Sequence, residues 1–196
     1  MKYSKQSIVL ISFLFAGCSF LFNPYKIVND EFKNCKTITV EQSLLSTEWN
    51  SVLSGATITV ERKISTENEV VNLYFVLTRK STSFNIEKKA YLKANGENYE
   101  INLENESSEY RTQQQSNTTS TTTKDSTKVK TEYKTETKNY DWYEDKFIVR
   151  LSPQQSNSLK ITNEILIRFY FGPEQATFII KGHSLEQIQK LLVKEL

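Results

Sequence analysis

Apolar and polar residues alternate along much of the chain after residue 35, which is the pattern of β-strands with one buried face. In KTITVEQ, Ile38 and Val40 lie on one face of such a strand. In TITVERKI, Ile58 and Val60 do the same. Residues 69–80, EVVNLYFVLTRK, are apolar at both odd and even positions, and this run predicts a central strand.

Two connecting segments carry turn signals. Asn95-Gly96 favours a tight type I′ hairpin, because both central residues of that turn need a positive φ. Folding the chain about this turn pairs Leu92 with Tyr99, Ala90 with Ile101 and Lys88 with Leu103. Residues 46–55 predict a short helical turn that is capped near Ser46 and closed by Gly55.

Residues 107–139 are rich in polar side chains. In the second half of this segment, Thr131, Thr135 and Thr137 alternate with lysine and glutamate. One face would therefore carry hydroxyl groups that suit a strand, and the other would carry charge. We expect a protruding hairpin with a threonine-rich tip at 116–125, and the alternative is a disordered loop of low complexity.

The last 45 residues predict two helices around a hairpin. Ser152 as N-cap with Pro153 behind it predicts a short helix that ends near Ile161. Gly172-Pro173 marks a hairpin turn, and residues 183–196 place apolar side chains at helical spacing. The predicted fold class is α+β, mainly antiparallel β: a sheet or sandwich with a long polar hairpin, a short helix and a C-terminal helix.

The chain begins with the apolar stretch IVLISFLFAGCSFLFNP, from Ile8 to Pro24, preceded by Lys2 and Lys5. A positive segment followed by about ten apolar residues is typical of a signal peptide, and the stretch falls short of the roughly 20 residues of a spanning helix. We therefore interpret residues 1–17 as a signal peptide. The residues around the end of this segment suggest that it belongs to a lipoprotein. The alternatives are an ordinary cleaved secretion signal and a short uncleaved membrane anchor.

The four residues Phe15-Ala16-Gly17-Cys18 resemble the lipobox of bacterial lipoproteins, although a phenylalanine stands where leucine is usual. The resemblance implies that Cys18 carries diacylglycerol, that the chain is cleaved before it, and that the new amino group is acylated, for example with palmitate. The N-terminal acyl chains would then hold the protein on a membrane of the bacterial cell envelope. Ser19 resembles the signal that sends enterobacterial lipoproteins to the outer membrane. On this interpretation residues 18–34 form a tether, and residues 35–196 form a single domain.

The C-terminal order of elements also resembles a pattern in uncharacterised bacterial envelope proteins. The pattern is a short helix, a strand containing IRFY (Ile167–Tyr170), a return strand and a closing helix. It covers less than a quarter of the chain, and it implies no catalytic residue.

Charge and cysteine usage narrow the function classes. The chain has 25 basic and 23 acidic residues, and removing residues 1–17 with their two lysines leaves 23 of each. A neutral chain has no general attraction for nucleic acid, so we expect no such partner. Cys35 has no disulfide partner if Cys18 is lipidated, whereas a Cys18–Cys35 disulfide is the alternative if it is not. Two cysteines and His183, the single histidine, make no zinc site without acidic ligands, and we expect no metal and no cofactor.

One segment concentrates aromatic rings beside carboxylates, and it is YDWYED, from Tyr140 to Asp145. Such a combination can hold sugars or cations, although a strand end with its rings half in the core has the same sequence. The candidate binding surface consists of Tyr140, Trp142, Tyr143, Thr119 and Thr121. Asp141, Glu144 and Asp145 could supply the acid pair of a glycan hydrolase. Because His183 is the single histidine, no catalytic arrangement that uses a second histidine is available. The leading interpretation assigns no catalytic residue.

The leading hypothesis is a lipid-anchored envelope protein that has a binding or structural role and is not an enzyme. Its partner would be an envelope protein or a glycan, met by the polar hairpin. The alternatives are the glycan hydrolase just described and a periplasmic ligand carrier, which would need an apolar cavity between its sheet layers.

Overall fold

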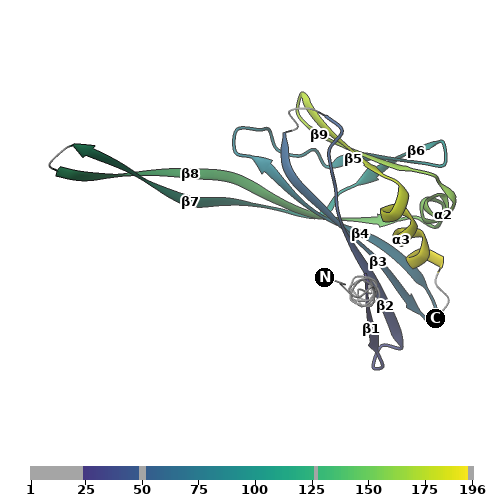
Figure 1. Cartoon of the computed structure of the whole chain (residues 1–196). Helices are drawn as coiled ribbons and strands as arrows, with labels where there is room; N and C mark the ends of the chain where they lie inside the picture. Colours follow the sequence, from purple (N-terminus) through teal and green to yellow (C-terminus); the bar gives the residue numbers. More distant parts are fainter. Residues whose placement is uncertain (1–23, 49–51, 126–127, 194–196) are drawn as a thin grey trace, which may run out of the picture.

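The computed structural model describes residues 24–48, 52–125 and 128–193, and in this part of the chain two antiparallel sheets pack with two helices (Figure 1). The first sheet has the strand order β1-β2-β3-β4-β8-β7, and the second has the order β10-β9-β5-β6. The first sheet consists of β1 (Tyr25–Asp30), β2 (Cys35–Ser43), β3 (Leu53–Ser65), β4 (Glu69–Lys80), β7 (Glu104–Asp125) and β8 (Lys128–Leu151). The second consists of β5 (Lys89–Ala94), β6 (Glu97–Asn102), β9 (Ile165–Phe171) and β10 (Glu174–Ile180). The helices are α2 (Pro153–Ile161) and α3 (Gly182–Val193). The predicted fold class is therefore confirmed.

The core lies between the two sheets and is built from the alternating apolar positions. Phe75 of β4, Phe147 of β8 and Phe169 of β9 form a cluster of rings with centroids 5.2–5.3 Å apart. All three side chains are almost completely buried. Burying a side chain of this size stabilises the fold by about 1.5–3 kcal/mol. These rings therefore join the middle of the first sheet to the second.

The predicted central strand and both predicted short hairpins are present. β4 lies between β3 and β8 in the first sheet. In the β5–β6 hairpin, Leu92 pairs with Tyr99 and Ala90 with Ile101, as the turn at Asn95-Gly96 requires. Asn95 and Gly96 have φ values of 50° and 80°, and these positive angles suit the short side chain of Asn and the absence of one in Gly.

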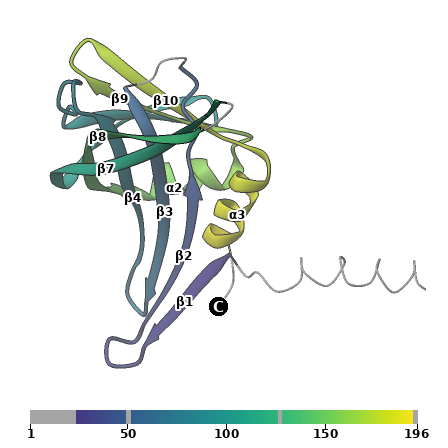
Figure 2. The same cartoon turned by 60° about the vertical axis from the view of Figure 1, so that its left-hand side comes forward.

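The two helices begin and end close to their predicted bounds. The Ser152 hydroxyl accepts a hydrogen bond from the Gln155 backbone N–H, and the Gln155 side chain accepts one from the Ser152 N–H, which completes a capping box for α2. In α3 the apolar side chains Leu185, Ile188, Leu191 and Leu192 are buried. Figure 2 shows α3 beside β2, with α2 behind it.

Two expectations for the N-terminal half need correction. The described part of residues 46–55 is not helical, because β3 begins at Leu53 and Ser46 forms a β-bridge with Phe178. Residues 25–30 of the expected tether form strand β1, which pairs with β2 from Tyr25↔Val40 to Asp30↔Cys35. Paired strands are therefore present about ten residues before the point that the alternation alone indicates.

Candidate functional site

The long polar hairpin is the most distinctive feature of the molecule, and it is ordered as two paired strands. β8 pairs with β4 only as far as Trp142↔Lys80. Beyond that point, residues 112–125 and 128–141 pair only with each other, and we call this part of the hairpin the arm. We call the rest of the described residues the body. At roughly 3.3 Å per residue the arm projects about 45 Å from it. Figure 1 shows the arm extending well clear of the remaining strands and of both helices.

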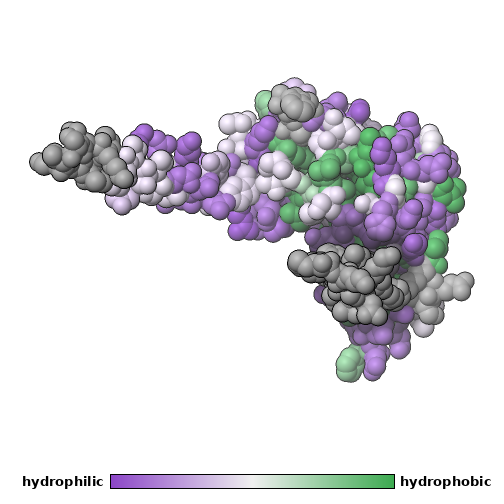
Figure 3. All heavy atoms as spheres, in the orientation of Figure 1, coloured by the Kyte–Doolittle hydropathy of each residue, from purple (hydrophilic) through white to green (hydrophobic). Residues whose placement is uncertain are grey.

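The two faces of the arm differ in chemistry. On one face hydroxyl groups pair across the strands, with Ser116 bonded to Thr137 at 3.1 Å and Thr118 bonded to Thr135 at 3.0 Å. On the other face Thr119 lies opposite Lys134. Side chains that alternate along a strand point to opposite faces, so the sequence pattern alone produces this division. The purple and white surface of the arm in Figure 3 shows no apolar patch on the visible side.

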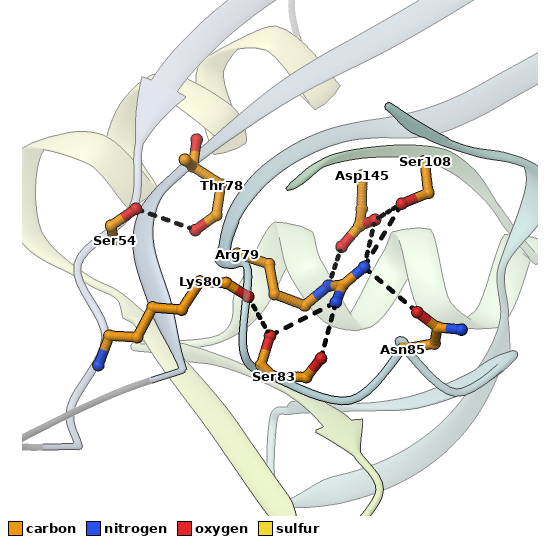
Figure 4. A network of polar contacts seen from close by, with 8 residues as sticks. All are labelled: Ser54, Thr78, Arg79, Lys80, Ser83, Asn85, Ser108 and Asp145. Carbon is orange, nitrogen blue, oxygen red and sulfur yellow. Dashed lines mark hydrogen bonds and ion pairs between the residues drawn. The ribbon is translucent and has the colours of Figure 1, made fainter. Parts of the chain in front are cut away.

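A buried ion pair lies where the arm leaves the body. The Nε of Arg79 donates to Oδ2 of Asp145 at 2.8 Å, and the two side chains are 1% and 0% exposed. Ser108 of β7 donates to the other carboxylate oxygen at 2.5 Å, and Arg79 also donates to the Ser83 carbonyl at 3.1 Å. Together with Asn85 these residues form what we call the root network (Figure 4).

Aromatic rings cover the root network. The guanidinium carbon of Arg79 lies 4.4 Å from the centre of the Tyr143 ring. The Tyr143 ring in turn meets Tyr110 edge-on, with the centroids 5.3 Å apart. A cation over an aromatic face is attracted by the ring quadrupole, more strongly where water is excluded. The root network thus ties β4, β7 and β8 together at the base of the arm.

Neither Arg79 nor the role of Asp145 follows from the sequence motifs, yet the sequence contains a signal for both. Asp145 stands in the same alternating phase as Phe147 and Val149, and Arg79 stands in phase with Phe75 and Leu77. A charge in the buried phase of a strand is rare unless it is paired. Opposite charges at buried positions of two different strands therefore indicate that the two side chains form an ion pair with each other.

Two aromatic residues of the candidate surface, Tyr140 and Trp142, line a cleft on the face of the sheet opposite the root network. The cleft has a volume of about 600 Å³ and lies between the base of the arm and the ends of β3 and β4. We call it the root cleft, and it is lined by Ser54, Thr78, Lys80, Ser81, Thr82, Gln113, Gln115, Tyr140, Asp141 and Trp142. Amide, hydroxyl and aromatic groups thus meet in one concave region.

The structure groups most of the candidate binding residues and separates one. Tyr140 and Trp142 lie on the same face of β8 as the partners of Thr119 and Thr121, so these four residues share one side of the hairpin. Tyr143 is on the opposite face, where it packs on Arg79. The two threonines lie further out along the arm than the residues of the root cleft.

The three candidate carboxylates do not converge. Asp145 is held by Arg79 in the interior, whereas Asp141 accepts a hydrogen bond from Thr112 at 2.9 Å on the surface. Glu144 points to the face opposite Asp145, where the hydrogen bond from Lys146 lowers its pKa. A general acid needs a raised pKa, so this geometry gives no support to an acid pair among them.

Two further hollows bear on ligand binding. The void between the sheet layers has a volume of about 10 Å³, so this part of the interior is packed and offers no carrier cavity. A cleft of about 680 Å³ lies on the outer face of the second sheet, with the rings of Tyr91 and Tyr170 edge-on at 5.9 Å. Leu166 and Arg168 also line this cleft.

The remaining candidates have ordinary surroundings. His183 lies in the first turn of α3, and its Nε2 is 2.8 Å from Nε2 of Gln187. Cys35 is a buried free thiol. Cys18 and the rest of the lipobox lie outside the described residues. In the described ranges, no group of three or more His, Cys, Asp or Glu is placed to hold a metal ion.

Comparison with known proteins assigns no relative. No family model, no curated protein and no solved structure matches the chain. No helix of the described residues is long and apolar enough to cross a membrane.

Proposed function

We propose that this protein is a lipid-anchored protein of the bacterial cell envelope, and that it binds an envelope partner through its arm without catalysing a reaction. The observation that carries the proposal is the arm itself. A hairpin about 45 Å long, with no core of its own and a buried network at its base, has no role in holding the body together. Its hydroxyl, amide and charged groups lie on the surface, where another molecule can contact them.

The anchor is supported by the lipobox-like sequence that ends at Cys18. Because β1 begins at Tyr25, only residues 19–24 separate the acylated residue from the folded domain. Six residues reach at most roughly 20 Å, so the body would lie close to the membrane surface. The outer membrane is the proposed location, on the ground of Ser19. The arm would then extend the reach of a protein whose body is confined near the lipid.

The anchor is tested with Cys18→Ala and radiolabelled palmitate in a bacterial host. The unchanged chain should incorporate label and enter the membrane fraction, and the variant should do neither. Cys35→Ala is the matched control, because Cys35 is buried in the domain and should leave labelling unchanged. A labelled, membrane-bound Cys18→Ala protein would refute lipid attachment at this residue.

Partner binding is tested with an arm that is shortened without disturbing its root. Gln115 and Lys138 are cross-strand partners, so Asn-Gly can replace residues 116–137 as a two-residue turn between them. We expect the shortened protein to keep its fold and to lose the partners that cross-linking captures on the unchanged protein in its native membrane. Equal capture by both proteins would refute the role of the arm.

A second candidate is glycan binding in the root cleft, which the placement of Tyr140 and Trp142 among amide and hydroxyl groups favours. Sugars commonly stack on exposed rings while amides and hydroxyls bond their hydroxyl groups. Soluble peptidoglycan fragments are a suitable probe for this cleft. Trp142→Ala should abolish their binding, whereas Trp142→Phe, which keeps a ring, should retain most of it. Unchanged binding by Trp142→Ala would exclude the cleft.

A further inference from the structure

We propose that the outer edge of β7 in the arm, residues 114–122, pairs antiparallel with the same edge of a second copy of this chain. The inference rests on the proposed function, because it names the partner of the arm. Two arms would then form one four-stranded sheet in the order β8-β7-β7-β8. The partner is identified by an open strand edge and by the distribution of charge along it.

The edge is open along the whole arm. β7 is the last strand in the order of the first sheet, and its one neighbour among the described strands is β8. Backbone N–H and C=O groups that point away from β8 therefore have no strand to bond. Such an edge is a template for another strand, and proteins usually protect it with charge, proline or a bulge.

The usual protection stops where the arm begins. Next to the body, β7 carries Glu104, Glu106, Glu109 and Arg111. From Thr112 to Thr123 the sequence is TQQQSNTTSTTT, which contains no charged residue, no proline and no glycine. The register irregularity of β7 also lies near the body, between Glu104 and Ser107. The run of β7 without charge, proline or glycine thus lies clear of the body, and charged residues return only at Lys124 and Asp125.

The opposite edge of the arm is protected. On β8, lysine and glutamate alternate, as Lys134 and Glu136 illustrate with an ion pair along the strand at 2.7 Å. Lysine on an edge strand is a common device against unwanted pairing. An added strand would therefore pair with the edge of β7 and not with the edge of β8.

A second copy suits this edge better than an unrelated strand does, because the edge is complementary to itself. A two-fold axis at Thr118 places Ser116 of one copy opposite Ser120 of the other and keeps even-numbered residues on the same face. The hydroxyl pairs that already link Ser116 to Thr137 and Thr118 to Thr135 would continue across the junction. This axis pairs residues 114–122 of the two copies with each other, and that range contains no charged residue.

The antiparallel arrangement also keeps the two bodies apart. A parallel pairing would bring both bodies to one end of the joined arms, whereas an antiparallel pairing puts them at opposite ends. Figure 1 shows that the arm lies clear of the body along its length, so the antiparallel partner has room. Because the same patch is used by both copies, the contact closes as a dimer.

Cysteine cross-linking in membranes tests the geometry on the full chain. Thr118→Cys should link two copies with a short bismaleimide, because the axis passes near this residue. Thr135→Cys is the matched control: it is exposed on the same face and pairs with Thr118 within one arm, but it lies one strand further from the junction. We expect Thr118→Cys to cross-link at least tenfold faster. Equal rates, or a product whose mass differs from two chains, would overturn the proposal.

Charge exchange tests whether residues 116 and 120 of two copies face each other. In the Thr118→Cys background, Ser116→Lys with Ser120→Lys should suppress cross-linking, and so should Ser116→Glu with Ser120→Glu. Mixing the lysine and glutamate forms should restore it, which excludes misfolding of either form. A mixture that stays unlinked would overturn the pairing of copies. It would leave the envelope function standing if the shortened arm still loses its captured partner.

Discussion

Arg79 and Asp145 form a fully buried, two-point ion pair between neighbouring strands, close to the place where β8 parts from β4. Nε of Arg79 is 2.8 Å and Nη2 is 3.3 Å from the two carboxylate oxygens. Asp145 lies opposite Leu77, and Arg79 lies opposite Tyr143. The pair is therefore a diagonal contact in the core-facing phase of the sheet, and it joins β4 to β8 at the base of the arm.

Removing one charge of this pair should be strongly destabilising. Asp145→Asn keeps the shape but leaves the Arg79 guanidinium buried without a counter-charge, which costs about 3–5 kcal/mol. Urea unfolding followed by circular dichroism measures the loss. Glu144→Gln is the matched control: its carboxylate pairs with Lys146 on the surface, and its replacement should change stability by less than about 1 kcal/mol. Equal losses in both variants would contradict the structural role of the buried pair.

The effect of an arm deletion on the stability of the body should depend on whether the deletion removes Ser108. The Asn-Gly replacement of residues 116–137 leaves the root network intact, so we expect a melting temperature within a few degrees of the unchanged protein. A deletion of residues 107–139 removes the Ser108 hydroxyl that bonds Asp145, and the lost hydrogen bond to a buried charge should cost about 1.5–3 kcal/mol. Differential scanning calorimetry compares the two. Equal melting temperatures would show that Ser108 is dispensable.

Gly172 should tolerate no side chain. Its φ is +60°, and a Cβ at this position would lie 3.1 Å from Cγ of Phe84. Gly172→Ala combines backbone strain with crowding, and we expect a loss of about 1–2 kcal/mol in urea unfolding. Gly96→Asn is the control, because a Cβ at Gly96 would have no atom within 4 Å and Asn adopts positive φ readily. A larger loss in the control would refute the contribution of Phe84.

Acid should remove one stabilising interaction between β3 and β4. The hydrogen bond from Arg62 lowers the pKa of Glu69, with their atoms 2.9 Å apart. Because the folded pKa is depressed, the contribution is fully present above the unfolded value of about 4.3 and is lost as pH falls through the folded value. Glu69→Gln should therefore weaken the pH dependence of stability below about pH 5. Parallel curves for both proteins in that range would contradict the coupling.

The accuracy of local predictions from the sequence depends on how local each signal is. The turn at Asn95-Gly96 and the cap at Ser152 are set by neighbouring residues, so the sequence predicts both correctly. The segment at 46–55 carries helical capping signals, but pairing with β10 through Ser46 overrides this local preference. Strand β1 escapes the alternation pattern because its side chains are largely exposed, and its pairing with β2 supplies the order.

In the candidate site, too, some features follow from neighbouring residues and others depend on contacts between distant strands. Alternation along β8 places Tyr140 and Trp142 on one face, and the aromatic cluster is visible in the composition of the segment alone. The sequence could not show that Ser54 and Lys80 complete a cleft beside them, since these residues come from distant strands. It also could not show that Asp145 is neutralised by Arg79, because that depends on the register between β4 and β8.

Periodicity and turn chemistry act over a few residues, and they are sufficient to predict the class of fold, the two helices, the short hairpins and the polar character of the arm. They do not reveal which strands are neighbours, which charges meet in the interior or which edge of the arm stays open. Those outcomes depend on the burial of surfaces that are far apart along the chain, and no local pattern records them.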